Sequence, residues 1–324
     1  MSAVAPGVGT GPLAHAPVVT LPAQVQRQTR GVVRDFIRRK PLGALGGAVV
    51  LVLILTAIFA GQIAPFAYDA GVSSARLQGP SLAHWFGTDN LGRDMFSRVV
   101  WGSRISVAVG FGAVFVGTGL ATVLGVVSGY VGGAFDLLFQ RIIDIWISFP
   151  AIILLVFLVS VFTTRNTDPF ATIFIVALTL GLIVASGTSR VIRSAVVSVR
   201  HTPYIEAELC LGAGHLRMLT RHVLPNVFAP ILILATTQLG GAILAESTLS
   251  FLGFGVKPPM PAWGSMLSGS GRDYFLQAPW MALWPGLAIT LAVFGFNMLG
   301  DALRDVLDPR LRGSDGSSAH GPQD

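Results

Sequence analysis

Six long apolar stretches restrict the fold of this chain more than any other feature. A helix that crosses a bilayer needs about 20 consecutive, mainly apolar residues. Only 12% of the 324 residues are charged, which is about half the share of an ordinary soluble chain. Pro150 interrupts the third stretch, but neighbouring helices can satisfy the backbone groups that a proline frees. We therefore predict an all-α integral membrane protein with six transmembrane helices, at residues 42–64, 105–129, 145–162, 171–187, 227–247 and 281–300.

The positions of the basic residues predict the orientation. Cytoplasmic loops of membrane proteins are enriched in Lys and Arg. With the N-terminus inside, the inner segments hold 15 of the 22 basic residues. We expect both termini in the cytoplasm. The parts are then a cytoplasmic tail at 1–41, the first span and an outer loop at 42–104, a core of five spans at 105–305 with a cytoplasmic loop at 188–226, and a second tail at 306–324.

The outer loop before the second span has a helical pattern of its own. Its apolar residues recur at helical spacing, and Asp94 and Arg98 are four residues apart, as in a favourable helical ion pair. Asp89 or Asn90 could cap such a helix. We predict a short amphipathic helix on the outer membrane surface, with a linker turn packed on the spans as the alternative. The apolar residues of the pattern are Leu91, Met95, Phe96, Val99 and Val100.

The sequence gives no support for covalent chemistry. A phosphate loop requires a lysine after a glycine, but Lys40 follows Arg39 and Lys257 follows Val256. The histidines are not spaced as metal ligands, and Cys210 is the only cysteine. We therefore expect no catalytic residues, no metal site and no cofactor. The basic balance follows the inner loops of a membrane protein, so we expect no nucleic-acid partner.

Polar groups within the spans are few. Asp144, Glu246 and Asp301 lie near the ends of the spans, and Glu246 could cap or brace the outer end of the fifth. No carboxylate lies at depth, which disfavours a carrier driven by protons. Neutral polar residues lie deeper in the last two spans. They could line a water-filled path, or they could form hydrogen bonds between helices. The candidate path residues are Thr236, Thr237, Gln238 and Asn297.

The stretch 204–226 is a patterned polar segment between two apolar ones. Pro203 can start a helix, and Glu206 lies in its first turn, where a carboxylate suits the helix dipole. Gly212 and Gly214 permit a reversal of the chain. A basic return helix follows, and Pro225 would open the fifth span. We predict that Ile205, Leu209 and Leu216 form the apolar face of this helical hairpin, which would be rigid enough to transmit force from a soluble partner. The alternative is an amphipathic loop on the inner leaflet.

Several motifs resemble the membrane subunits of bacterial ABC importers. Glu206-Ala207-Glu208, Gly212 and Val223-Leu224-Pro225 look like the family's "EAA" signature, although alanine is usual at position 208 and isoleucine at 223. "FGTDNLGRDMFSRVVWGSRISVAVG" (86–110), "ESTLSFLGFGVKPPMPAWGSML" (246–267), "GDALRDVLDPRLR" (300–312) and "RRKPLGALGGAVVLVLIL" (38–55) resemble the C-type permease of the dipeptide, oligopeptide and nickel group.

The resemblance implies a five-helix core of the type I permease fold with one additional N-terminal helix. It also implies a second permease, one or two ATPase subunits that hold ATP and Mg²⁺, and an extracytoplasmic solute-binding protein, all at the bacterial cytoplasmic membrane. In this family the EAA segment forms a coupling helix that docks on the ATPase. The corresponding positions here are Tyr204, Glu206, Ala207, Gly212, Ala213, Arg217, Arg221, Leu224 and Pro225.

We therefore predict a permease subunit of an ATP-driven importer for short peptides. An importer of the same class for nickel, haem or another small solute is the nearest alternative. A secondary carrier driven by an ion or proton gradient, and a scaffold or sensor without transport, are the alternatives from other classes.

Overall fold

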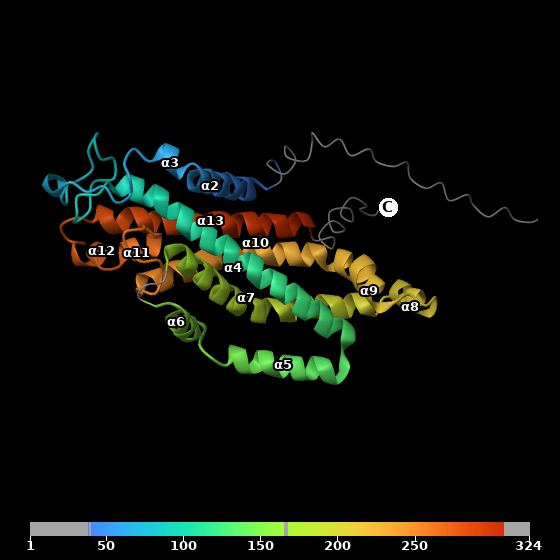
Figure 1. The fold of residues 1–324 in the computed structure, drawn as a ribbon. Coiled ribbons are helices and arrows are strands. Elements are labelled where there is room, and N and C mark those ends of the chain that lie inside the picture. Colours follow the sequence, from blue (N-terminus) through green and yellow to red (C-terminus); the bar gives the residue numbers. More distant parts are fainter. Residues whose placement is uncertain (1–37, 39, 165–167, 308–324) are drawn as a thin grey trace, which may run out of the picture.

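The computed structural model describes residues 38, 40–164 and 168–307 (Figure 1). Within these ranges the chain is helical, and extended pairing is limited to two isolated bridges in the loop before α4. The elements are α2 (Pro41–Ile58), α3 (Ala60–Ile63), η1 (Ser73–Ala75), α4 (Met95–Val131), α5 (Gly133–Ile147), α6 (Ala151–Phe162), α7 (Pro169–Arg200), α8 (Pro203–Cys210), α9 (His215–Arg217), η2 (Met218–Val223), α10 (Leu224–Phe251), α11 (Trp263–Leu267), α12 (Ser270–Asp273) and α13 (Trp280–Leu307).

Five helices of the described chain are long and apolar enough to cross a membrane: α2, α4, α7, the continuous helix from α9 to α10, and α13. The sixth candidate is the pair α5 and α6, which is bent by 88°. The all-α membrane fold is therefore confirmed. The prediction of one continuous span at 145–162 was wrong, because the chain breaks after Ile147. Pro150 has no N–H for an intrahelical bond and its ring collides with the preceding turn, so it caps α6 instead.

α4 and α7 form the central pair, and small residues let them approach closely. A Cβ on Gly125 would lie 2.6 Å from the Ser189 carbonyl oxygen, and one on Gly117 would lie 2.8 Å from that of Gly181. Backbone contact through small residues is a main way in which membrane helices associate. The contact also explains why α7 continues to Arg200, well beyond the predicted span 171–187: Ile192 and other buried residues of its last turns pack on α4.

α10 and α13 complete the core, and α2 packs outside it. The buried side chains of Val109, Ile243 and Phe296 join α4, α10 and α13 in one apolar cluster. α2 lies at one edge of the bundle beside α13, and α5 lies at the opposite edge (Figure 1). Lys40 at the start of α2 donates to the Asp305 carboxylate of α13 at 2.6 Å. α8 and α9 lie at one end of the bundle, and α11 and α12 lie at the other (Figure 1).

The loop before α4 contains no separate amphipathic helix, so that prediction was wrong. The helical pattern belongs to the first turns of α4, in which Met95 and Val100 are buried. Asp94, rather than Asp89 or Asn90, caps this helix by accepting a hydrogen bond from the Ser97 N–H at 2.7 Å. The predicted ion pair of Asp94 with Arg98 does not form, because Asp94 is the N-cap residue and precedes the first helical turn. The Asp94 carboxylate pairs with His84 at 2.9 Å instead.

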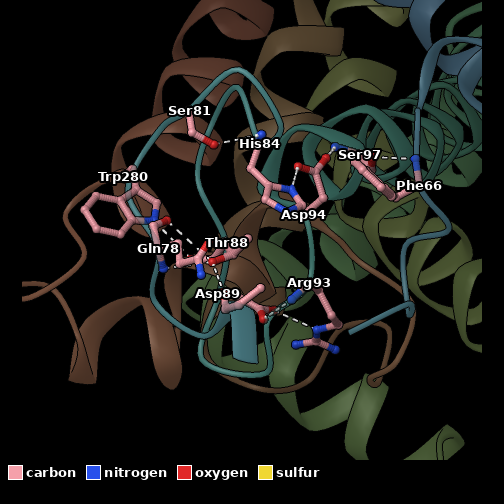
Figure 2. A network of polar contacts seen from close by, with 11 residues as sticks. Phe66, Gln78, Ser81, His84, Thr88, Asp89, Arg93, Asp94, Ser97 and Trp280 are labelled. Carbon is pink, nitrogen blue, oxygen red and sulfur yellow. Dashed lines mark hydrogen bonds and ion pairs between the residues drawn. The ribbon is translucent and has the colours of Figure 1, made fainter. Parts of the chain in front are cut away.

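Polar contacts hold this outer loop in one shape (Figure 2). The Asp89 carboxylate accepts hydrogen bonds from the N–H groups of Leu91 and Arg93, at 2.8 and 2.9 Å, and from Arg93 Nε at 2.7 Å. The Trp280 indole N–H, at the start of α13, donates to the Thr88 carbonyl at 3.0 Å. The loop is therefore fastened to both the second and the last long helix.

Candidate functional site

α8 is a short helix anchored by a single apolar side chain. Thr202 precedes it, Pro203 occupies its first turn and Glu206 lies near its start. Ile205 is fully buried among Met218 and Val223 of η2. Leu209 and Leu216, the other two residues of the predicted apolar face, are exposed by 39% and 75% and are not buried with Ile205. An eight-residue helix gains little stability alone, so this anchor fixes its position.

The predicted reversal lies at Gly212. Its φ is +83°, in the left-handed region that glycine adopts without a Cβ penalty. The Gly212 N–H donates to the Leu209 carbonyl at 3.0 Å, and the Ala213 N–H donates to the Glu208 carbonyl at 3.1 Å. These two bonds define a Schellman ending, which satisfies carbonyls that the end of a helix leaves free. Gly214 has an ordinary φ of −69° and only precedes the return helix.

The return helix begins at His215 and continues to Phe251 without a break. Pro225 lies in the first turn of α10, as predicted, but the continuous helix that contains α10 begins ten residues earlier than Pro225. The first turns of the continuous helix include a π-helical segment, Met218–Val223, and Leu224 separates this segment from Pro225. Proline offers no N–H to the carbonyl four residues earlier, and its ring crowds that carbonyl. The wider π-helical turn before Pro225 is consistent with this crowding.

Two hydrogen bonds fasten the hairpin to the bundle. The Tyr130 hydroxyl, at the end of α4, lies 3.0 Å from His215 Nδ1. The Asn226 side-chain amide donates to the Tyr204 hydroxyl at 2.9 Å. These bonds link α9 directly to α4, and α8 directly to α10. The roles of Tyr130, His215 and Asn226 do not follow from the sequence, because their pairing depends on contacts across 85 and 22 positions.

The hairpin presents a mixed apolar and charged surface beyond the bundle. Leu211 at the turn is exposed by 83% and Tyr204 by 44%. Such isolated apolar side chains on a projecting, well-anchored tip can bind a groove on another protein. Of the predicted coupling residues, Ala213 is half-buried, and the others are exposed: Tyr204, Glu206, Ala207, Gly212, Arg217, Arg221, Leu224 and Pro225.

The predicted path residues make contacts within and between helices in this conformation. The Thr236 and Thr237 hydroxyls donate to carbonyls of their own helix, and Thr237 packs on Gly300 of α13. Gln238 donates to the Thr188 hydroxyl of α7 at 3.3 Å. A Cβ on Gly240 would lie 2.7 Å from Asn297 Oδ1, which places Asn297 against α10. Thr237, Gln238 and Asn297 therefore contact neighbouring helices in this conformation.

Carboxylates in the bundle lie in two different surroundings. Arg193 of α7 donates to the buried Asp136 of α5 at 2.6 Å, and Ser128 of α4 also donates to it. This contact, which the sequence analysis missed, holds α5 to the central pair. Glu246 is not an end cap: it is 1% exposed, and the Ser250 hydroxyl donates to it at 2.7 Å. Within the described residues, no group of three or more His, Cys, Asp or Glu could hold a metal ion.

Comparison with known proteins defines the class. Residues 121–313 match the family of binding-protein-dependent transport system inner membrane components, so the chain belongs to this family of ABC transporter permeases. Residues 28–80 match the N-terminal transmembrane domain of oligopeptide transport permease C. The chain is thus a multi-pass inner-membrane permease subunit, a class without an ATPase site of its own.

Individual relatives cover most of the chain. It is 42% identical over 276 residues to the dipeptide transport system permease protein DppC of Alkalihalophilus pseudofirmus, covering 85% of this chain and 88% of the relative. It is 39% identical over 293 residues to the glutathione transport system permease protein GsiD of Escherichia coli O6:K15:H31, covering 90% and 94%. A putative peptide transport system permease protein of Brucella suis is 38% identical over 279 residues, covering 86% and 91%.

Proposed function

We propose that this permease imports short peptides and that ATP hydrolysis on partner subunits drives the import. Relatives named for dipeptide, peptide and glutathione transport, each aligned over most of the chain, support the substrate class. A second permease would complete the pathway, one or two ATPase subunits would supply ATP and Mg²⁺, and an extracytoplasmic binding protein would deliver the peptide. The chain then lies in the bacterial cytoplasmic membrane with both termini in the cytoplasm.

The single observation that supports coupling is the projecting hairpin of α8 and α9. Its tip is exposed at Leu211, while its base is buried at Ile205 and hydrogen-bonded to α4 through His215. Closure of the ATPases would displace this tip and, through its fixed base, the ends of α4 and α10. The coupling contacts would come from Tyr204, Glu206, Ala207, Gly212, Ala213, Arg217, Arg221, Leu224 and Pro225.

The path for the solute would run along the interface with the second permease. Thr236, Thr237, Gln238 and Asn297 are the proposed path residues on this chain. For these to contact solute, the helix contacts of Thr237, Gln238 and Asn297 would have to open during the cycle. The alternating access of the pair provides such a change of packing.

Reconstitution tests the proposal. The chain is incorporated into liposomes with its second permease, its ATPase subunits and its binding protein, and uptake of a labelled dipeptide is measured. We expect uptake only with ATP and the ATPase subunits, and competition by unlabelled peptides rather than by nickel or haem. Uptake driven by an ion or proton gradient without the ATPases would assign the chain to the secondary carriers. Competition by nickel or haem alone would change the substrate class.

A further inference from the structure

A cavity of about 240 Å³ opens at the end of the bundle opposite α8. Its wall combines the beginning of α4, the end of α10, the loop 252–262, α11 and the start of α13. The polar and charged network of the loop before α4 lies beside it (Figure 2). The cavity is thus built from segments that are more than 150 positions apart, and no single motif of the sequence describes it.

The charged groups of the wall are three cations and one carboxylate: Arg93, Arg98, Lys257 and Asp89. The Asp89 carboxylate already accepts the three hydrogen bonds that close the turn before α4. One of these comes from Arg93 Nε, which lies 2.7 Å from it. The three cations of the wall therefore outnumber its one carboxylate, which lies near both arginines.

Arg98 is the most buried of the three cations. It is 7% exposed, yet it donates one hydrogen bond within the described chain, from Nη1 to the Tyr68 carbonyl at 3.0 Å. Its Nε lies 3.7 Å from Asp89, too far for a hydrogen bond. Asp69 also exerts an attractive charge on it. A guanidinium has five N–H donors, so Arg98 can donate to a further acceptor in the cavity.

Lys257 stands at the rim of the same cavity. Its ammonium donates to the Thr164 carbonyl at 2.9 Å, which holds the side chain across the loop after α6. An ammonium has three donors, so the group can bind a further acceptor. A buried guanidinium and a rim ammonium together match a carboxylate, because charge-assisted hydrogen bonds of this kind are short and strong.

The remaining wall contains three serines, Ser250, Ser265 and Ser268, and an adaptable apolar part. Met95, Met266 and Met281 line the cavity together with Val256. Methionine side chains are flexible and fit side chains of different shape. The volume is below the range of about 300–1,000 Å³ that encloses a whole small ligand. The cavity therefore suits the end of a longer molecule, with a charged group bound by Arg98 and variable apolar groups held by methionines.

We propose that this cavity binds the C-terminal carboxylate of the transported peptide at the outer mouth of the permease. The proposal rests on the function proposed above. It gives the permease a selectivity of its own: a free carboxylate is favoured, and the adjoining side chain is only loosely specified. The cavity would receive the peptide end on its release from the binding protein and before it enters the path.

The test compares a dipeptide with its C-terminal amide in the complete reconstituted importer. Each is supplied at a concentration that occupies the binding protein equally, as measured separately. Lys257→Met removes the rim charge from an exposed site, and Arg98→Lys keeps the charge but loses the fork-shaped donor set. We expect each variant to raise the KM of the free acid by roughly threefold to tenfold and to leave that of the amide unchanged. Arg104→Gln, which removes an exposed cation of α4 outside the cavity, should change neither.

Three results would overturn the proposal. One is an equal rise for acid and amide, because the cations would then act through the structure alone. Another is no change in any variant. The third is a fall in the affinity of the peptide-free binding protein for the permease, which would make the cations a docking site for that protein. Failure of the unaltered importer to take up either peptide refutes the proposed function instead, before any variant is compared.

Discussion

Replacing Gly212 with alanine tests whether the reversal between α8 and α9 controls coupling. No heavy atom lies within 4 Å of the place where a Cβ would stand, so the methyl group meets no steric obstacle. The penalty comes from the backbone alone, because φ is +83°. An L-residue in the left-handed region costs about 1–2 kcal/mol, which shifts the balance between the turn and open loop conformations by roughly 5- to 30-fold.

Gly214 provides a matched control. It also has open space around its Cβ position, but its φ is −69°, which alanine adopts freely. Alanine there should be neutral, or stabilising by up to about 1 kcal/mol. Proline at position 212 is the severe variant, because its ring fixes φ near −65° and it removes the N–H that donates to Leu209.

The assay measures peptide uptake and ATP hydrolysis in liposomes that contain the complete importer. We expect Gly212→Pro to insert normally but to lose uptake, with Gly212→Ala intermediate and Gly214→Ala unchanged. Affinity for the ATPase subunits should fall in the same order. Normal uptake by Gly212→Pro at normal expression would refute the reasoning. Equal defects in the two alanine variants would show that flexibility, rather than the left-handed turn, matters.

Four further variants form two pairs: the first pair separates contacts within the bundle from contacts with partners, and the second tests the packing of α4 on α7. Ile205→Ala removes a fully buried side chain and should lower the free energy of unfolding by about 2–5 kcal/mol. Leu211→Ala should leave the melting temperature unchanged and lower the affinity for the ATPase subunits about fivefold. The reverse pattern would contradict the assigned roles. Gly125→Ala places a Cβ 2.6 Å from the Ser189 carbonyl oxygen and should cost about 1–3 kcal/mol by overpacking α4 on α7. Gly119→Ala has nothing within 4 Å and is its control; equal melting temperatures for the two in detergent would contradict the close approach of these helices.

The hairpin shows where local sequence signals suffice. Pro203 and Gly212 mark the start of α8 and the reversal after it, and both features occur as predicted. These signals work because they act within a few residues: a fixed φ, a missing N–H or a missing Cβ. The exposure of Leu209 and Leu216 could not be predicted in the same way, since a short helix with one anchor can bury any of several apolar side chains.

The breaks and extensions of the long helices depended on their neighbours. Apolar composition located most spans, but it could not decide that the chain bends by 88° between α5 and α6, or that the pattern before residue 105 belongs to α4. A proline within an apolar run can kink a helix or end it, and the surrounding packing selects the outcome. Likewise, the first turns of α4 are helical and buried because Trp263 and the outer loop cover them.

The sequence by itself determined that this chain is an all-helical membrane protein with a projecting hairpin, because bilayer thickness and turn geometry act on short, contiguous segments. Only the tertiary structure decided which polar groups meet. Asp136 reaches Arg193 across 57 positions, and the outer cavity brings Arg98 near Lys257. Charges isolated in the sequence become a site only when folding places them on one wall, where the low dielectric of the protein strengthens each hydrogen bond that they form.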